Sequence, residues 1–244
     1  MSVRWRGVTF DWWGTLYVYR DARARRLQAV CDALRAHGCD LPEERIVEVY
    51  DRGAERLERE WRAGRVYRPC EWLADTLQQL HVSMSEDACR LLQRDAEEAM
   101  LDNPPLLVAG AAALLADLHQ GGIAIGLISD TGLTIGRVMR LILAQDGILP
   151  YFSGFAFSDE VGVTKPHRRA FERALGQMGL RPEEAVHVGD LPETDICGAT
   201  AVGMRAVLVT GVSGRQDDGH ADAVVGGFAE LRGLFREWGL LPAK

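Results

Sequence analysis

The sequence has very little lysine. Of its 28 basic residues only Lys165 and Lys244 are lysines, and the others are arginines. Lysine carries a compact point charge, whereas arginine presents a planar fork of donors. A lysine kept inside an arginine-rich chain is therefore predicted to be required for its chemistry. Lys244 is the last residue of the sequence, so this prediction concerns Lys165.

Long apolar runs are missing as well. No stretch of the sequence reaches the roughly 18 to 20 apolar residues that a membrane-spanning helix requires. The first residues lack the apolar core of a secretory signal. We therefore expect a cytoplasmic protein that has no membrane partner.

Cysteines are few, and like charges do not gather in blocks. No C-x-x-C pair and no zinc-spaced cluster with histidine is present, which predicts reduced, mostly buried thiols at Cys31, Cys39, Cys70, Cys89 and Cys197. The net charge of −7 argues against a nucleic-acid partner. With 244 residues, 47% of them apolar, the chain is long enough for a packed, enzyme-sized body, which we expect to be a monomer or a homodimer.

The region after Pro105 alternates between short apolar strands and helices. Strands are expected at residues 123–128, 154–157, 185–188 and 205–209, and helices at 109–119, 133–143, after Pro166, at 194–202 and at 229–238. This alternation predicts right-handed βαβ units and an α/β fold with a Rossmann-like parallel sheet. Residues 8–10 are expected to join this sheet, and residues 223–225 to extend one edge of it.

Residues 17–103 show helical periodicity only. Four apolar runs predict four helices, marked by Leu27, Ile46, Trp72 and Leu91. Ser83 and Glu86 are predicted to form the capping box that begins the fourth helix. We predict an α/β core made of residues 1–16 and 104–244, with residues 17–103 inserted as an all-helical cap over the strand ends.

Four short segments place a polar residue where an apolar run ends. They are the segment Asp11-Trp12-Trp13-Gly14-Thr15, the pair Ser129-Asp130, the pair Lys165-Pro166, and Gly189-Asp190 with Asp195 behind it. The carboxyl ends of parallel strands meet at one edge of a sheet, where α/β proteins build their sites. The segments therefore predict a site that contains carboxylates, a hydroxyl group and an ammonium group.

In their order and spacing these segments resemble the four motifs of the haloacid dehalogenase superfamily. The inserted helices resemble those of the branch with an all-helical cap between the first and second motifs. The resemblance implies a hydrolase that acts on a small anionic molecule. It also implies that Asp11 is a nucleophile, giving a covalent aspartyl intermediate that water hydrolyses. Lys165 would neutralise negative charge, and Ser129 would donate a hydrogen bond to a phosphoryl oxygen.

Resemblance to the phosphatase members of this superfamily also implies Mg²⁺. An anionic carboxylate that approaches an anionic phosphoryl group is repelled unless cations lie between them. Mg²⁺ prefers oxygen ligands, and the resemblance assigns it to Asp11, Asp190 and the backbone carbonyl of Trp13, with Asp195 helping directly or through water.

Trp13 departs from the phosphatase pattern, which has a second carboxylate at this position. An indole has no proton that titrates near neutrality, and general acid–base assistance is worth about 10² to 10⁴ in rate. The preferred interpretation is a phosphatase that is slow, acts on good leaving groups, or borrows an acid such as Asp130. The alternatives are a 2-haloacid dehalogenase-like enzyme, or a binding or regulatory protein with impaired catalysis. Phosphonate cleavage is excluded because it needs a cap lysine, and residues 17–103 contain none.

Several residues also have structural interpretations. Trp12 is expected to be a packing residue, Trp13 a cavity wall in contact with substrate, and His187 a buried, hydrogen-bonded histidine. For Asp130 and Asp195 helix capping remains an alternative to a role in the site. The remaining expectations are cap-core positions for Trp61, Trp72 and Tyr67, exposure for Glu193, and a solvated helix face for Arg23, Arg25 and Arg26, one of which reaches the mouth of the site.

Overall fold

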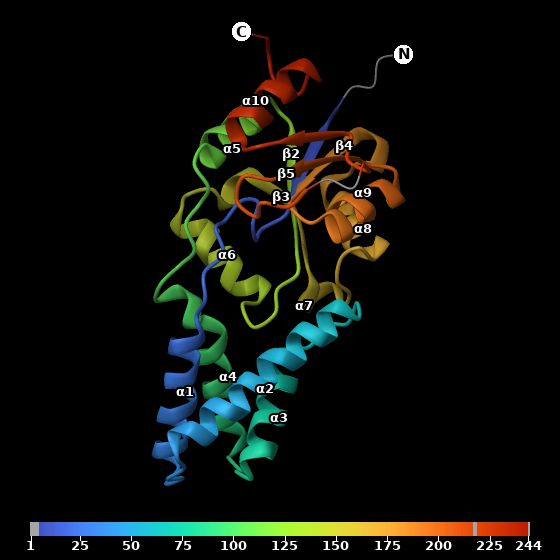
Figure 1. Ribbon diagram of the computed structural model, residues 1–244. Helices are drawn as coiled ribbons and strands as arrows, with labels where there is room; N and C mark the ends of the chain where they lie inside the picture. The colour runs from blue at the N-terminus through green and yellow to red at the C-terminus, as the bar shows by residue number, and fades with distance from the viewer. Residues whose placement is uncertain (1–4, 217–218, 244) are drawn as a thin grey trace.

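The computed structural model describes residues 5–216 and 219–243, and one parallel sheet of six strands lies at its centre (Figure 1). The strands are β1 (Gly7–Phe10), β2 (Ala124–Ser129), β3 (Phe152–Phe157), β4 (Ala185–Gly189), β5 (Arg205–Val209) and β6 (Ala223–Val225), in the spatial order β3-β2-β1-β4-β5-β6. The chain winds outward from β1 in both directions. In such sheets ligands bind beside the carboxyl end of the strand where the winding changes direction.

β1 carries the first motif to that point. All four of its residues are buried, as expected of a strand that has helices on both faces. Phe10 pairs with Leu127 of β2 and with Val188 of β4, and the Asp11 amide donates to the Val188 carbonyl at 2.8 Å. The end of β1 is therefore fixed between the ends of both neighbouring strands.

Helices cover both faces of the sheet. On one face α5 (Ala111–Gln120), α6 (Gly136–Gln145) and α10 (Phe228–Glu237) share an apolar cluster with Val8 and Phe10. On the other face α8 (Arg168–Met178) and α9 (Cys197–Val202) pack through Phe171 and Ala199. The predicted α/β fold with a Rossmann-like sheet is confirmed.

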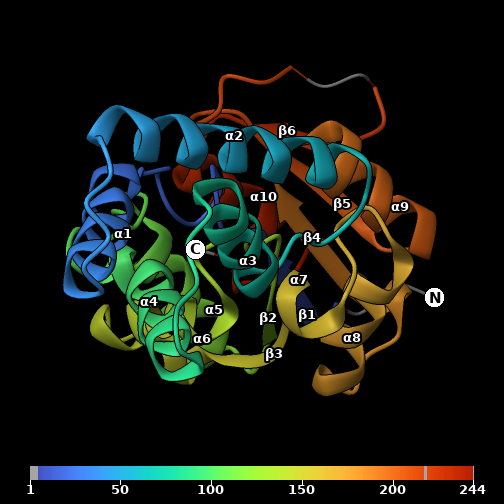
Figure 2. The ribbon, with the colours of Figure 1, turned by 90° about the horizontal axis from the view of Figure 1, so that it is seen from below.

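A second group of helices lies beyond the carboxyl ends of the strands (Figure 2). It comprises α1 (Arg23–Ala36), α2 (Glu43–Arg62), α3 (Pro69–Leu80) and α4 (Glu86–Glu98), which pack around their own apolar cluster. The two connections to the sheet run side by side, because Val18 N donates to the Leu106 carbonyl at 2.9 Å. The exact division of the chain at residues 17 and 103 stays a prediction.

Three predicted helix starts were wrong or displaced. Ser85, not Ser83, begins α4, and its Oγ accepts from Ala88 N at 3.3 Å. α5 starts two residues late, after Gly110, whose φ of 86° is left-handed. α6 begins only at Gly136, because Thr134 N closes a turn onto the Thr131 carbonyl. The sequence did not predict α7 (Ser158–Val161) or the short turns η1 (Ala99–Leu101), η2 (Leu149–Tyr151) and η3 (Pro182–Glu184). The helix predicted at 194–202 is divided between the π-helical η4 (Pro192–Ile196) and α9.

Two expected absences can be compared with the structure. All five cysteines are free thiols, but the expectation that most of them are buried was wrong, because only Cys31 is buried and Cys70 is exposed. Over residues 5–216 and 219–243, none of the helices combines the length and the apolar character needed to cross a bilayer.

Candidate active site

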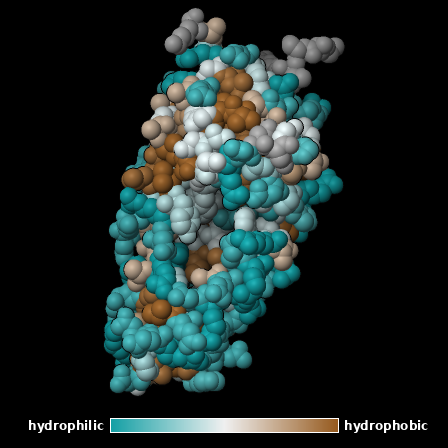
Figure 3. Space-filling model, viewed as in Figure 1, coloured by the Kyte–Doolittle hydropathy of each residue, from teal (hydrophilic) through white to brown (hydrophobic). Residues whose placement is uncertain are grey.

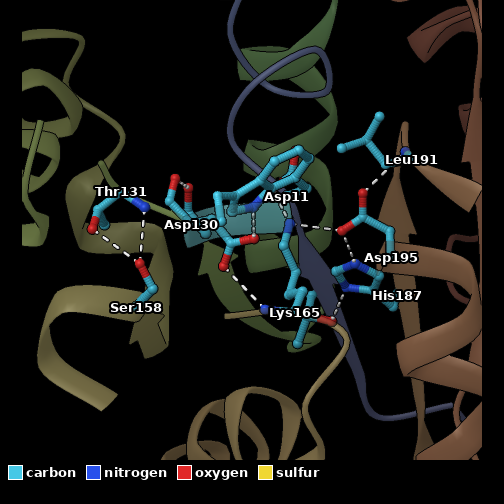
Figure 4. A network of polar contacts seen from close by, with 11 residues as sticks. Asp11, Asp130, Thr131, Ser158, Lys165, His187, Leu191 and Asp195 are labelled. Carbon is cyan, nitrogen blue, oxygen red and sulfur yellow. Dashed lines mark hydrogen bonds and ion pairs between the residues drawn. The ribbon is translucent and has the colours of Figure 1, made fainter. Parts of the chain in front are cut away.

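Lys165 joins two of the predicted carboxylates at the end of β1 (Figure 4). Its ammonium group donates to Asp11 Oδ1 and, at 2.7 Å, to Asp195 Oδ1. The three side chains are between 0 and 5% exposed. A buried charge requires a partner, so the single lysine inside the chain holds two carboxylates that lie 184 residues apart in sequence.

Asp190 brings a third carboxylate to the same place. One oxygen from each of Asp11, Asp190 and Asp195 lies within 4.8 Å of the other two. Asp190 Oδ1 is buried and has no hydrogen-bond partner within the described part of the chain. Gly14 has a φ of 73°, and a Cβ there would collide with the Asp190 carboxylate. The glycine of the first motif thus allows Asp190 to approach β1.

The carboxylates of this cluster differ in their affinity for protons. Burial raises the pKa of Asp11, against the opposing effect of Lys165. Burial and the neighbouring Asp195 raise the pKa of Asp190 to about 6. Burial would also raise the pKa of Asp195, but the Lys165 charge and the His187 hydrogen bond hold it below its usual value. The cluster holds three carboxylates and one ammonium group, so a second cation would balance its remaining negative charge.

His187 supports this cluster from inside β4, as predicted. It is fully buried, with Nδ1 at 2.8 Å from Thr9 Oγ1 and Nε2 at 3.1 Å from Asp195 Oδ1. Burial lowers its pKa, which favours the neutral ring. Asp195 Oδ2 accepts from Leu191 N at 3.1 Å, so this side chain fixes the turn after β4 and does not cap α9.

A cavity of about 540 Å³ lies between the strand ends and the helices of residues 23–98. Figure 3 shows the surface hollowed at this level. Asp11, Trp13 and Lys165 line the cavity on the sheet side. Trp12 is fully buried and stacks on Tyr17, with ring centroids 4.1 Å apart. The predictions for both tryptophans therefore agree with their positions: Trp12 packs and Trp13 forms a wall.

Asp130 connects the two sides of the cavity. Its Oδ2 accepts from Trp61 Nε1 of α2 at 2.9 Å, and its Oδ1 accepts from Lys165 N at 3.1 Å. The prediction that Trp61 belongs to the cap core was wrong, because its indole reaches toward Asp130 and lines the cavity. Trp72 and Tyr67 do lie in the apolar cluster of the helices. Capping of α6 by Asp130 is not observed among its hydrogen bonds.

Ser129 lies at the end of β2, where its side chain is buried and its Oγ donates to the Asp130 carbonyl at 3.3 Å. It is not among the residues that line the cavity. Ser158 and Thr131 are among the lining residues that were missed: Ser158 Oγ accepts from Thr131 N at 3.0 Å and contacts its hydroxyl at 3.1 Å. Ser158 directly follows β3, so the rule that selected Ser129 would have found it.

Two arginines of α1 reach the site, where one was expected. Arg23 and Arg26 both line the cavity, whereas Arg25 pairs with Asp102 at 2.6 Å outside it. Arg23 is held by Asp51 through contacts of 2.7 to 2.9 Å. Glu193 is exposed, as predicted.

Residues 5–203 match a protein family described as haloacid dehalogenase-like hydrolase. The chain is 28% identical over 203 residues to the ribulose-1,5-bisphosphate 5-phosphatase of Halopiger xanaduensis, covering 82% of this chain and 83% of that protein. It is 46% identical over 95 residues to the glyceraldehyde 3-phosphate phosphatase of Methanothermobacter thermautotrophicus, covering 39% and 41%. The chain spans about half the length of the first curated relatives that it matches.

Solved structures share the fold. The chain superposes on a 2-haloacid dehalogenase from Pseudomonas syringae pv. Tomato with a TM-score of 0.70 and 23% identity, over 96% of this chain and 99% of that one. A HAD phosphatase from Thermococcus onnurineus gives a TM-score of 0.62 and 23% identity, over 94% and 97%. Since one neighbour is a dehalogenase and the other a phosphatase, the shared architecture does not distinguish the two chemistries.

Proposed function

Because the chain belongs to the haloacid dehalogenase-like hydrolases, we propose that it is a Mg²⁺-dependent phosphatase for a small phosphorylated molecule. The observation that carries this proposal is the arrangement of three carboxylates around one ammonium group, with Asp190 Oδ1 left without a partner. The displacement of halide from carbon has no obvious use for a third carboxylate there. The names of the curated relatives also support phosphate as the group that is transferred.

The proposed reaction has two steps on Asp11. A carboxylate oxygen of Asp11 attacks phosphorus, and the bond from phosphorus to the leaving oxygen breaks. Water then attacks the aspartyl phosphate, which releases inorganic phosphate and restores Asp11. Lys165 neutralises charge on Asp11 and on the phosphoryl oxygens during both steps. To donate a hydrogen bond to a phosphoryl oxygen, as the resemblance implies, the Ser129 hydroxyl would have to turn away from the Asp130 carbonyl.

The donor set fits a hard divalent cation. Mg²⁺ takes oxygen ligands in octahedral geometry and keeps several waters, and when bound it supplies charge neutralisation between the carboxylates and the phosphoryl group. Asp11, Asp190 and the Trp13 carbonyl would hold it. Asp195 would contribute through water, because its two oxygens already accept from Lys165, His187 and Leu191 N.

Trp13 limits the leaving groups that this site releases quickly. Asp130 is not a free replacement acid, because both of its oxygens accept hydrogen bonds. We assign Asp130 and Trp13 to the shape of the substrate cavity. Departure without a proton donor favours aryl and acyl phosphates, whose leaving groups are weaker bases than alkoxides.

The test compares two substrates under two conditions. We expect release of phosphate from p-nitrophenyl phosphate with Mg²⁺, none with a chelator, and none in either condition for Asp11→Asn. Release of halide from 2-chloropropionate that is insensitive to chelator would replace the proposal with dehalogenase chemistry. If neither substrate reacts in the wild type or in Trp13→Asp, the binding or regulatory alternative is favoured.

A further inference from the structure

Arg26 is a buried cation on the helical side of the cavity. It lies in the first turn of α1, is 8% exposed, and lines the cavity. Its Nε donates to the Ala96 carbonyl of α4 at 3.0 Å, and one terminal nitrogen donates to Thr134 Oγ1 at 2.8 Å. It also contacts the Tyr50 hydroxyl. Each of these partners is neutral.

Most other charged residues of the same cavity are already paired. Arg23 is held by Asp51 and Arg65 by Glu60. On the acidic side, Glu58 pairs with Arg62, whereas the exposed Asp21 accepts a hydrogen bond from the backbone N–H of Arg23. Across residues 5–216 and 219–243, no carboxylate lies within ion-pair distance of the Arg26 guanidinium.

Arg20 is the nearest comparison. It too lines the cavity and donates to uncharged oxygens, those of Asn103 and Pro104. Arg20 is only half-buried, so water can solvate its charge. Arg26 is only 8% exposed, so water reaches its charge far less, and a buried charge without a counter-ion is costly.

We propose that Arg26 binds a second anionic group of the substrate, a carboxylate or a second phosphate, separate from the phosphoryl group that is transferred to Asp11. A guanidinium has five N–H donors in a planar fork that matches either anion. The contacts with Ala96, Thr134 and Tyr50 leave donors for such a group and fix the direction of the fork. This inference rests on the proposed function, because it takes the phosphoryl group to lie at Asp11.

Binding of inert phosphonates tests the inference without turnover. The probes are alkylphosphonates, ω-carboxyalkylphosphonates and alkane bisphosphonates of matched chain length, titrated calorimetrically into the wild-type protein with Mg²⁺. At one chain length we expect a carboxylate or a second phosphonate to tighten binding about 10- to 100-fold over the uncharged chain, as a charge-assisted pair does. The carboxylate and bisphosphonate arms distinguish the two sources of the anion.

Three variants locate the effect. Arg26→Gln should abolish the preference for the doubly anionic probes while leaving the affinity for the plain alkylphosphonate within about threefold. Arg26→Lys should keep part of this preference. Arg25→Gln removes one charge from the same helix outside the cavity and should keep the full preference for the doubly anionic probes. Melting curves of each variant check that it is folded.

The outcomes separate two kinds of failure. A preference that persists in Arg26→Gln, or phosphonate binding without any preference at all chain lengths, overturns the role of Arg26 alone. If Arg26→Gln weakens all phosphonates equally, or does not fold while Arg26→Lys shows no preference, Arg26 is structural and the inference is wrong. If no phosphonate binds the wild type, the proposed phosphate site fails and the inference fails with it.

Discussion

On the sheet side of the cavity the charges are buried against one another, whereas on the helical side most of them pair at the surface. Lys165 and its two carboxylate partners are at most 5% exposed. The side chains of Arg23 and Arg65, which pair with Asp51 and Glu60, are 41% and 65% exposed. Breaking a buried pair costs several kcal/mol, while an exposed pair contributes about 0 to 1 kcal/mol. Chemistry and stability are therefore coupled on the sheet side and nearly independent on the helical side.

Asp11→Asn gives the largest expected effect on activity. Removal of the nucleophile should lower turnover at least about 10³-fold. Stability should fall less than in Asp195→Asn, because burial raises the pKa of Asp11 and so offsets part of what its charge gains from Lys165. Phosphate release and urea unfolding of the same preparation measure the two quantities. Turnover that survives Asp11→Asn would rule out the covalent mechanism.

Asp195→Asn is the matched variant. It also removes one carboxylate, but this one binds Lys165, His187 and Leu191 N. The neutral amide would weaken the interaction with Lys165. Its NH₂ group would also face a group that already donates a hydrogen bond to this side chain. We expect activity to be lost and the free energy of unfolding to decrease by about 3 to 5 kcal/mol. Equal stability of the two variants would contradict the coupling on the sheet side.

Trp13→Asp should produce the largest gain in phosphatase activity. A carboxylate at this position would supply the missing acid, and we expect about 10²-fold faster release of an alkyl alcohol from its phosphate, near the lower limit for such assistance. The rate with p-nitrophenyl phosphate should change far less, because its leaving group needs no proton. Trp13→Asn controls for the loss of the indole. A gain of the same size with Asn would show that Trp13 acts by obstruction.

Trp61→Phe tests the one contact that joins the two sides through Asp130. Loss of the N–H should raise KM about tenfold, which corresponds to a hydrogen bond of about 1.5 kcal/mol to a charged group, and leave kcat within about threefold. Trp238→Phe removes an indole that packs against Trp5 and does not line the cavity, and it should change neither quantity. A fall in kcat alone would instead assign Asp130 to the chemical step.

The sequence predicted the sheet side well and the helical side poorly. Asp11 directly follows a buried strand, so finding the strand also locates the carboxylate, and the same holds for Asp190 after β4. The contact between Trp61 and Asp130 spans 69 residues, and that between Arg26 and Thr134 spans 108. Helical periodicity predicts which face of α1 or α2 is apolar, but not which residue reaches another element. Such contacts depend on how whole helices pack.

Glu184→Gln should give the smallest effect and probes a surface pair. Glu184 accepts from Arg181 N at 3.0 Å and from Arg6 at 2.9 Å, and these contacts lower its pKa to about 2. A lowered carboxylate pKa contributes stability above the ordinary value of 4.5 and loses it as the pH falls toward 2. Thermal melts should therefore show a slightly lower Tm than wild type at pH 7, with the difference vanishing near pH 2. Glu183→Gln removes the adjacent exposed carboxylate, which pairs with Arg181 at 3.2 Å, and serves as the control for the loss of one negative charge. A difference in Glu184→Gln that persists at pH 2 would mean that packing, not charge, stabilises this end of β4.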